Sequence, residues 1–329
     1  MSKSFLIIQT AFTGDVILAT ALAEKLRESN PENSIDILVR KGNESLFTEH
    51  PFIKQILIWD KKNNKYRNLF ALLSKIRANK YDVIINLQRF AATGLLSVFS
   101  GAKETRGFDK NPLSFLFTKR IKHSVEKGKH EVERNNLLIA DITGNSKSLP
   151  RLYPTEKDFK TIESYKHNNF ITISPASVWA TKTLPYYKWI ELINLSQKMN
   201  PNLQFFLLGS PDEFHIAENI RKSAGEKNIT NLCGVLSLLQ SAALMKSATM
   251  NYVNDSAPMH LASAMNAAVT AVYCSTIPGF GFGPLSEISR IIETKLSLPF
   301  RPCGLHGFKE CPLVHFKCAH SIETNEIIT

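Results

Sequence analysis

Asp15 is a carboxylate at a place in the chain where acid–base chemistry is possible. It lies between a short apolar run, residues 5–8, and the start of a helical pattern. A carboxylate there either caps the helix or faces a binding site beyond the strand, where it can take a proton from a bound hydroxyl group. Because the helix dipole lowers the pKa of a carboxylate, the second role needs an apolar surrounding to offset the dipole. Both roles remain open.

Two loops in the second half of the chain carry a charged residue soon after an apolar run. Lys182 is the only cation between Ser174 and Tyr186. It is either solvated or, at the edge of a binding site, balances the charge that develops on a departing diphosphate. Glu213 opens a helical pattern directly after residues 204–208. An acid there either interacts favourably with the helix dipole or accepts hydrogen bonds from ribose hydroxyl groups.

A third segment, from Asp255 to His260, follows another buried strand. Asp255 or Ser256 can cap the helix that Pro258 begins. The exposed backbone N–H groups at such a helix start suit a diphosphate. His260 is either a buried core residue or a donor to phosphate.

The C-terminal tail interleaves three cysteines with three histidines, namely Cys303, His306, Cys311, His315, Cys318 and His320. These are enough ligands for zinc, but the cysteines lack the close pair spacing of structural zinc sites. Buried thiols, a labile disulfide and a metal held by Cys303, Cys311, Cys318 and His315 are the three alternatives. We expect no metal.

The elements that position these residues are strands and helices in alternation. Nine apolar runs have the length of buried strands, at residues 5–8, 35–39, 56–59, 83–87, 170–174, 204–208, 229–233, 250–253 and 269–273. Helical patterns separate most of these runs, which predicts βαβ units and parallel sheets. The pattern lapses into a polar stretch at residues 149–169. We therefore expect an α/β protein with two doubly wound, Rossmann-like domains, 1–155 and 156–329, that face each other across a ligand-binding cleft.

Composition and charge narrow the class of protein. The chain has 329 residues, 43% of them hydrophobic, with five cysteines and a net charge of +11. This composition indicates a globular protein, and the odd number of cysteines indicates a reducing, cytosolic compartment rather than a disulfide framework. We find no apolar stretch of membrane-spanning length and no P-loop, HExxH or nucleic-acid-binding motif.

The positive charge is concentrated in the first half. Residues 1–150 hold 24 basic and 15 acidic side chains, a net charge of +9. This is either a solvated surface or a binding surface for an anionic partner, such as a phosphorylated glycolipid or a membrane. The densest basic run, residues 119–123, follows the segment 114–117, in which Phe115 and Phe117 either belong to the core or dock at a membrane interface.

These pieces resemble glycosyltransferase family 9, the ADP-heptose:lipopolysaccharide heptosyltransferases, nearly end to end and nearest to the heptosyltransferase II branch. The stretches that carry the resemblance are IIQTAFTGDVILATALAEKLRE, NLQRFAATGLLSVFSGAKETRGFD, NLCGVLSLLQSAALMKSA, VNDSAPMHLASAM and the Cys-rich end RPCGLHGFKECPLVHFKCAHSI. The resemblance implies the two-domain GT-B fold and an inverting, metal-independent transfer of heptose from ADP-heptose. No cofactor is implied, because ADP-heptose is a substrate.

The resemblance also implies roles for single residues. The base would be Asp15, and the cation on the leaving diphosphate would be Lys182. Glu213 would bind the ribose, and the diphosphate cradle would comprise Asp255, Ser256, Ala257 and His260. The acceptor residues would be Thr13, Gln88, Arg89 and Arg106. The family usually has Gly where this chain has Ala257, and a turn that needed a positive φ there would be strained by alanine.

The implied acceptor is an anionic glycolipid, a lipid A-linked precursor that carries Kdo or heptose. We therefore expect a cytoplasmic enzyme that associates transiently with the inner face of the bacterial inner membrane. Two other classes remain open. One is an enzyme of the same architecture that uses another nucleotide sugar, either a transferase or an epimerase, and the other is a non-catalytic protein that binds anionic ligands.

Overall fold

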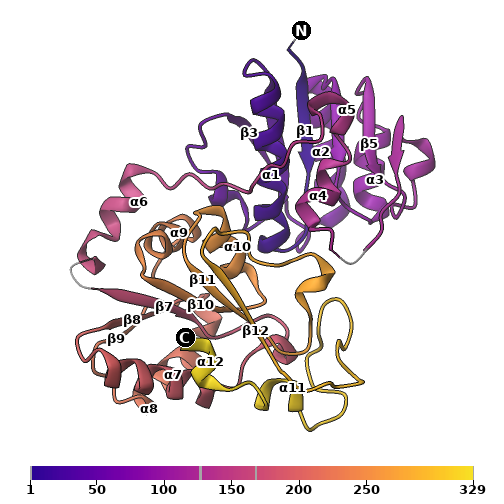
Figure 1. Cartoon of the computed structure of the whole chain (residues 1–329). Coiled ribbons are helices and arrows are strands. Elements are labelled where there is room, and N and C mark those ends of the chain that lie inside the picture. The colour runs from indigo at the N-terminus through magenta and orange to yellow at the C-terminus, as the bar shows by residue number, and fades with distance from the viewer. Residues whose placement is uncertain (1, 126–127, 167–168, 329) are drawn as a thin grey trace. The chain divides into compact units, whose positions relative to one another are not determined.

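The computed structural model describes residues 2–125, 128–166 and 169–328 and divides the chain into two compact units. The N-terminal unit is Met1–Tyr153 and the C-terminal unit is Pro154–Thr329. Each unit is built around its own sheet (Figure 1). No helix in the described residues has the length and apolar character needed to cross a bilayer.

The N-terminal unit contains a six-stranded, all-parallel sheet with strand order β3-β2-β1-β4-β5-β6. Its strands are β1 (Ser4–Ile8), β2 (Ser34–Arg40), β3 (Ile53–Trp59), β4 (Val83–Asn86), β5 (Glu104–Phe108) and β6 (Lys119–Ile121). Its α-helices are α1 (Thr13–Ser29), α2 (Lys65–Asn79), α3 (Ala91–Val98), α4 (Glu131–Asn136) and α5 (Ala140–Thr143). Its 3₁₀ helices are η1 (Glu44–Phe47) and η2 (Ser114–Leu116).

Helices cover both faces of this sheet. Because side chains alternate along a strand, Leu6 and Ile8 of β1 share one face. On that face they pack against apolar side chains of α2 and α3. Helix α1 packs instead with α4 and α5, and nearly every α1 residue from Val16 to Leu26 is buried. Most of these buried residues are apolar, as expected of a helix covered on several sides, and the buried Thr20 and Glu24 are hydrogen-bonded.

The C-terminal unit repeats the same plan with strand order β12-β11-β10-β7-β8-β9, again all parallel. Its strands are β7 (Phe170–Ser174), β8 (Gln204–Leu207), β9 (Ile229–Asn231), β10 (Met250–Asn254), β11 (Val269–Tyr273) and β12 (Ser289–Glu293). Its α-helices are α6 (Glu156–Thr161), α7 (Tyr186–Met199), α8 (Phe214–Ser223), α9 (Leu238–Ser247), α10 (Ala257–Ala264), α11 (Lys317–His320) and α12 (Thr324–Ile328). Its 3₁₀ helices are η3 (Glu163–Tyr165), η4 (Ala180–Lys182), η5 (Pro211–Glu213) and η6 (Pro278–Phe280).

The predicted class, two doubly wound α/β sheets, is confirmed. All nine predicted strands form, and three further strands, β5, β6 and β12, were missed. Strand β6 is Lys-Arg-Ile and β12 begins Ser-Arg, so neither presents an apolar run. Both lie at a sheet edge, where charged side chains discourage pairing with another chain.

The polar stretch at residues 149–169, which we placed at the domain boundary, contains ordered elements within its described residues. The Arg151 N–H donates to Thr20 Oγ1 at 3.0 Å and the Tyr153 hydroxyl donates to Glu24 Oε1 at 2.9 Å, so this part is tied to α1. Residues 156–161 then form α6, capped by Thr155 and packed on α9. The two units separate between residues 153 and 154.

Both sheets reverse their winding direction at one place. In the N-terminal unit this switch point lies between β1 and β4, and in the C-terminal unit between β7 and β10. Ligands of doubly wound sheets bind outside the carboxyl ends of the strands at such a point. The segments that follow β1, β4, β7 and β10 are therefore the candidate binding segments, and they contain most of the residues singled out from the sequence.

Candidate functional site

Asp15 lies in the first turn of α1, beside the N-terminal switch point. The N-cap residue is Phe12, whose side chain makes no capping hydrogen bond, so Asp15 is not the N-cap residue. The alternative role as a plain cap is therefore wrong. Asp15 is partly exposed and interacts electrostatically with Arg40 at the end of β2. A partly exposed carboxylate at a switch point has the access that a general base needs.

Two basic residues that lie against the segment after β1 were missed from the sequence. Arg40 ends β2 and its guanidinium lies 4.8 Å from the centre of the Phe12 ring. Lys61 follows β3, and its Nζ donates to the carbonyl oxygen and to Oγ1 of Thr10, at 2.8 and 3.0 Å. Burial, together with the charges of Arg40 and Lys65, lowers the pKa of Lys61 to about 8. The signal available in the sequence was a basic residue at, or two residues after, the end of a strand.

Three of the four expected acceptor residues lie near the same switch point. Thr13 Oγ1 donates to Asn43 Oδ1 at 2.9 Å. The buried Gln88 amide donates to Gln9 Oε1, which joins the ends of β4 and β1. Arg89 is exposed, with its guanidinium 5.4 Å from the centre of the adjacent Phe90 ring. Of these three side chains, Arg89 is the one most open to a ligand.

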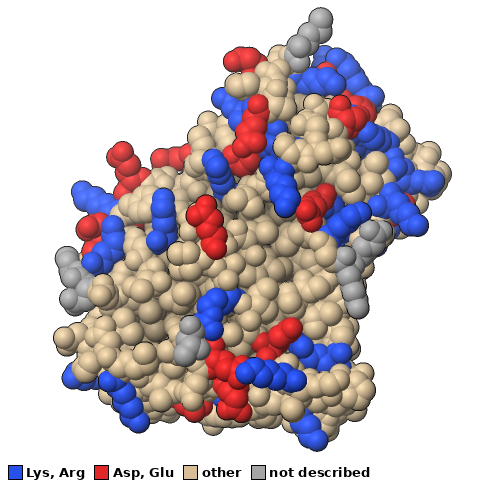
Figure 2. Space-filling model, in the orientation of Figure 1, with Lys and Arg blue, Asp and Glu red and all other residues tan. Residues whose placement is uncertain are grey.

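Arg106, the fourth expected acceptor residue, has a structural environment. Its side chain is buried in β5, and its guanidinium pairs with Glu104 at 2.6 Å and with Asp141 at 2.6 Å. It also donates to the carbonyl oxygen of Leu138 at 2.9 Å. These partners account for the charge without a ligand, so we leave Arg106 out of the proposed site. Figure 2 nevertheless shows Lys and Arg side chains gathered on the side of the unit that carries β5.

Lys182 ends η4, beside the C-terminal switch point, and forms a buried ion pair. Its Nζ lies 2.7 Å from Asp255 Oδ2, and Thr276 Oγ1 donates to the same oxygen at 2.6 Å. Asp255 follows β10 directly and is only 5% exposed. Since a buried carboxylate repels a diphosphate, this geometry assigns Asp255 to holding Lys182 rather than to contacting phosphate.

The start of α10 presents backbone N–H groups next to this pair. Ser256 is the N-cap residue, but its side chain does not cap the helix, and Asp255 is occupied by Lys182 and Thr276. Ala257 is the first helical residue, so no positive φ is required there and alanine causes no strain. His260 is buried within the same helix. The uncapped N–H groups can therefore receive an anion.

Glu213 lies one strand away from the C-terminal switch point and takes part in a capping box. Its Oε2 accepts a hydrogen bond of 2.7 Å from the backbone N–H of Ser210. A Cβ atom at Gly209 would lie 2.6 Å from the same oxygen, so the backbone passes very close to the carboxylate. The capping role thus occupies one carboxylate oxygen, and ribose binding by Glu213 stays a prediction.

The C-terminal tail supports the segment that carries Lys182. The Phe308 N–H donates to Thr181 Oγ1 at 2.7 Å, and the Thr181 N–H donates to the Phe308 carbonyl oxygen at 3.1 Å. Arg301 donates to the carbonyl oxygens of Tyr273, Cys274 and Thr276, which fixes the segment after β11. The tail therefore holds both Lys182 and the threonine that orients Asp255.

Substitution of Gly307 tests this support. Gly307 has φ +74°, and a Cβ there would lie 3.0 Å from Thr181 Oγ1 and 3.1 Å from Lys182 Cγ. We expect Gly307→Ala to lower stability by about 1–3 kcal/mol and to weaken ADP binding, as thermal unfolding and calorimetric titration would measure. The matched control is Gly144→Ala, which has the same φ of +74° but no atom within 4 Å of the added carbon. Equal ADP affinity in both variants would contradict the supporting role.

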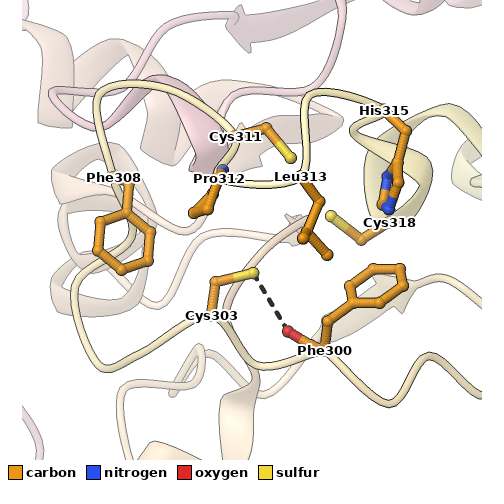
Figure 3. A pocket seen from close by; sticks show the side chains of 8 residues that line it. All are labelled: Phe300, Cys303, Phe308, Cys311, Pro312, Leu313, His315 and Cys318. Carbon is orange, nitrogen blue, oxygen red and sulfur yellow. Dashed lines mark hydrogen bonds between the residues drawn. The ribbon is translucent and has the colours of Figure 1, made fainter.

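The tail cysteines surround a small apolar cavity of about 280 Å³ (Figure 3). Its lining residues are Phe300, Cys303, Phe308, Cys311, Pro312, Leu313, His315 and Cys318. All three thiols are free, and burial raises the pKa of Cys318 to about 11. Within residues 2–125, 128–166 and 169–328, no group of three or more His, Cys, Asp or Glu side chains is arranged to hold a metal ion. The geometry favours free thiols, of which Cys318 is buried and Cys303 and Cys311 are partly exposed, and the absence of a metal stays a prediction.

The sequence and the fold of this chain are both similar to those of known proteins. The model of glycosyltransferase family 9 (heptosyltransferase) matches residues 69–300. Lipopolysaccharide heptosyltransferase 3 of Escherichia coli is 25% identical over 279 residues, which cover 80% of this chain and 82% of that protein.

Solved structures share the fold over most of the chain. A glycosyl transferase family 9 protein from Veillonella parvula superposes with a TM-score of 0.86 at 20% identity, covering 100% of this chain and 96% of that one. Escherichia coli heptosyltransferase WaaC with ADP gives a TM-score of 0.71 at 22% identity, covering 88% and 92%. WaaC is also known with ADP-2-deoxy-2-fluoro heptose. The expected GT-B architecture of two Rossmann-like sheets is thereby confirmed.

Proposed function

Because this chain belongs to glycosyltransferase family 9, the heptosyltransferases, we propose that it transfers heptose from ADP-heptose to an inner-core sugar, Kdo or heptose, of a lipid A-linked lipopolysaccharide precursor. The proposal draws its acceptor from the named lipopolysaccharide heptosyltransferases that resemble the chain. It draws its donor from the WaaC structures with ADP and with a fluorinated ADP-heptose. In this proposal the enzyme works at the inner face of the bacterial inner membrane, as a peripheral protein in the cytoplasm.

One observation carries the proposal. Asp15 and the Lys182–Asp255 pair lie at the switch points of two sheets with equivalent strand order. Each sheet therefore offers one binding edge, and the two edges carry opposite chemistry. A carboxylate in the N-terminal unit suits an acceptor hydroxyl group, and a cation beside a helix N-terminus in the C-terminal unit suits a diphosphate.

The C-terminal unit would stabilise the leaving group. As the bond between the anomeric carbon and the diphosphate oxygen breaks, its electron pair leaves with ADP and adds negative charge to the diphosphate. The Lys182 ammonium and the N–H groups at the start of α10 would stabilise that charge. Asp255 and Thr276 hold the lysine in place before the donor arrives. Because these groups supply the positive potential, the proposed transfer is metal-independent.

The N-terminal unit would activate the acceptor. Asp15 would take the proton of the acceptor hydroxyl group as that oxygen bonds to the anomeric carbon. Attack on the face opposite the departing ADP inverts the configuration at that carbon. Donor and acceptor must be brought together for this single displacement, which is the contribution of positioning to the rate.

Arg40, Lys61 and Arg89 would bind the anionic groups of the acceptor, which gives a pH-dependent prediction. The pKa of Lys61 is about 8, so its ammonium is present below that pH and is lost as the pH rises through it. We expect the KM for the acceptor to rise by about three- to tenfold between about pH 7 and pH 9. The KM is obtained from initial rates measured as a function of acceptor concentration at several pH values between about 7 and 9.

Lys61→Arg is the control for this pH dependence, because an arginine stays protonated throughout the range. Its acceptor KM should stay flat with pH. If the variant keeps the pH dependence of the unchanged protein, Lys61 does not bind the acceptor.

The proposed function is tested by incubating the protein with ADP-heptose and truncated lipopolysaccharide acceptors, with ADP release and product mass both followed. Transfer to an acceptor with mass gain of one heptose supports the proposal. A thermal-shift screen of nucleotide sugars covers the alternative donor, because a true ligand stabilises the folded protein by mass action. Stabilisation by a different nucleotide sugar, without heptose transfer, would overturn the proposed donor.

A further inference from the structure

Helix α3 presents an apolar surface to solvent. It contains no charged residue, and its outward row consists of Ala91, Leu95 and Phe99, spaced four residues apart. Leu95 is 39% exposed and Phe99, directly after the helix, is 52% exposed. The helix packs against β4 and α2 and buries Thr93, Gly94, Leu96 and Ser97. Its outward apolar row is therefore left in solvent.

Helix α2 extends the same surface. It packs beside α3 (Figure 1), and its Leu69, Leu72 and Ile76 face the core. On its other side, Tyr66 and Phe70 are 71% and 68% exposed and lie one turn apart. We call Tyr66, Phe70, Leu95 and Phe99 the α2–α3 face. Exposed aromatic residues on adjacent helices form an apolar patch of the kind that marks an interaction surface.

The charge around this face has one sign. Residues 61–103 carry nine basic side chains and one acid. That acid, Asp82, is already bound by Lys103 at 2.7 Å and by the N–H and hydroxyl groups of Ser4. Arg67, Lys75 and other basic residues of α2 are exposed. Asp60, directly before this segment, is likewise paired, with Lys41 at 3.0 Å, so the aromatic patch is bordered by an excess of positive charge.

We propose that the α2–α3 face docks on the surface of an anionic phospholipid bilayer. Apolar side chains that enter the headgroup region, flanked by Lys and Arg that pair with lipid phosphates, are the two components of interfacial binding. A second copy of this chain would bring the same positive charge against itself, so the charge favours lipid over self-association. This inference rests on the proposed function, because an enzyme with a lipid-linked acceptor has to work at a membrane.

The α2–α3 face is distinct from the basic run at residues 119–123. Before that run Phe117 is buried, whereas Phe115 and Leu116 are 68% and 49% exposed, and within it Lys119 pairs with Asp141 at 2.7 Å. Exposed apolar side chains and cations therefore occur in both places, and the variants below test the α2–α3 face alone.

The test is co-sedimentation of the full chain with vesicles of phosphatidylethanolamine and phosphatidylglycerol, compared with vesicles of phosphatidylcholine alone. We expect binding to the anionic vesicles and at least about tenfold weaker binding to the neutral ones. Phe70→Ser combined with Leu95→Ser should weaken binding to anionic vesicles about tenfold or more. Arg67→Glu combined with Lys75→Glu should weaken it similarly and remove its salt sensitivity.

Matched variants in the C-terminal unit control for loss of exposed apolar surface and of charge. Met199→Ser with Ile288→Ser removes two side chains that are 76% and 65% exposed. Lys157→Glu with Lys222→Glu reverses two exposed charges. Both control variants should bind vesicles like the unchanged protein, and thermal unfolding should show that every variant is folded.

Three outcomes would overturn the proposal. The first is equal vesicle binding by the α2–α3 variants and their controls. The second is loss of a dimer, measured by light scattering, in Phe70→Ser/Leu95→Ser without a change in vesicle binding. The third is no binding to anionic vesicles at all. Turnover on a soluble, delipidated acceptor is measured in parallel and should be unchanged in the α2–α3 variants, so a failure of the proposed function is seen separately.

Discussion

Asp15→Asn is expected to lower the turnover number by about 10²–10⁴-fold while ADP-heptose still binds. That range is the usual contribution of a positioned general base. Asparagine keeps the size of the side chain but cannot take the proton of the acceptor hydroxyl group, and the residues proposed to bind the donor lie in the other unit. The measurements are initial rates of ADP release and a calorimetric titration with ADP-heptose.

Glu28→Gln is the control for this variant, because Glu28 is an exposed carboxylate on the same helix. Its turnover should match that of the unchanged protein. Loss of Asp15 also removes a favourable interaction with the N-terminus of α1, worth about 0.3–1 kcal/mol, so thermal unfolding should shift by only a few degrees. Near-normal turnover in Asp15→Asn would remove Asp15 from the mechanism.

Lys182→Ala is expected to lower turnover by about 10²–10³-fold and to weaken ADP binding. The substitution removes the cation that would stabilise the departing diphosphate, and a single such electrostatic group contributes rate factors of this size. It also leaves Asp255 buried beside Thr276 without its counterion. Breaking one partner of a buried ion pair costs about 3–5 kcal/mol of stability, so a folding defect must be separated from a catalytic one.

The double variant Lys182→Met/Asp255→Asn makes this separation. It removes the charge of both partners, so it should recover much of the stability lost in Lys182→Ala without recovering turnover. Lys198→Ala, an exposed lysine at the end of α7, is the surface control. If the double variant regained turnover together with stability, Lys182 would be a structural residue and the diphosphate role would be wrong.

The sequence determined which segments become strands and which loops follow them. An apolar run between two helical patterns indicates a strand that is buried on both faces. Nine such runs correctly predicted nine strands. Since ligands of parallel sheets bind after the strand ends, the same pattern singled out Asp15, Lys182 and Asp255. Strands β5, β6 and β12 escaped because their residues are largely polar and carry no apolar signal.

The tertiary structure decided which of these residues act together. Strand order brings the segments after β7 and β10 to one switch point, and that places Lys182 on Asp255. It also brings Arg40 to Asp15. Contacts between residues far apart in the sequence depend on the order of the strands in the sheet. The spacing of apolar residues along the chain shows which residues are buried but does not show that order.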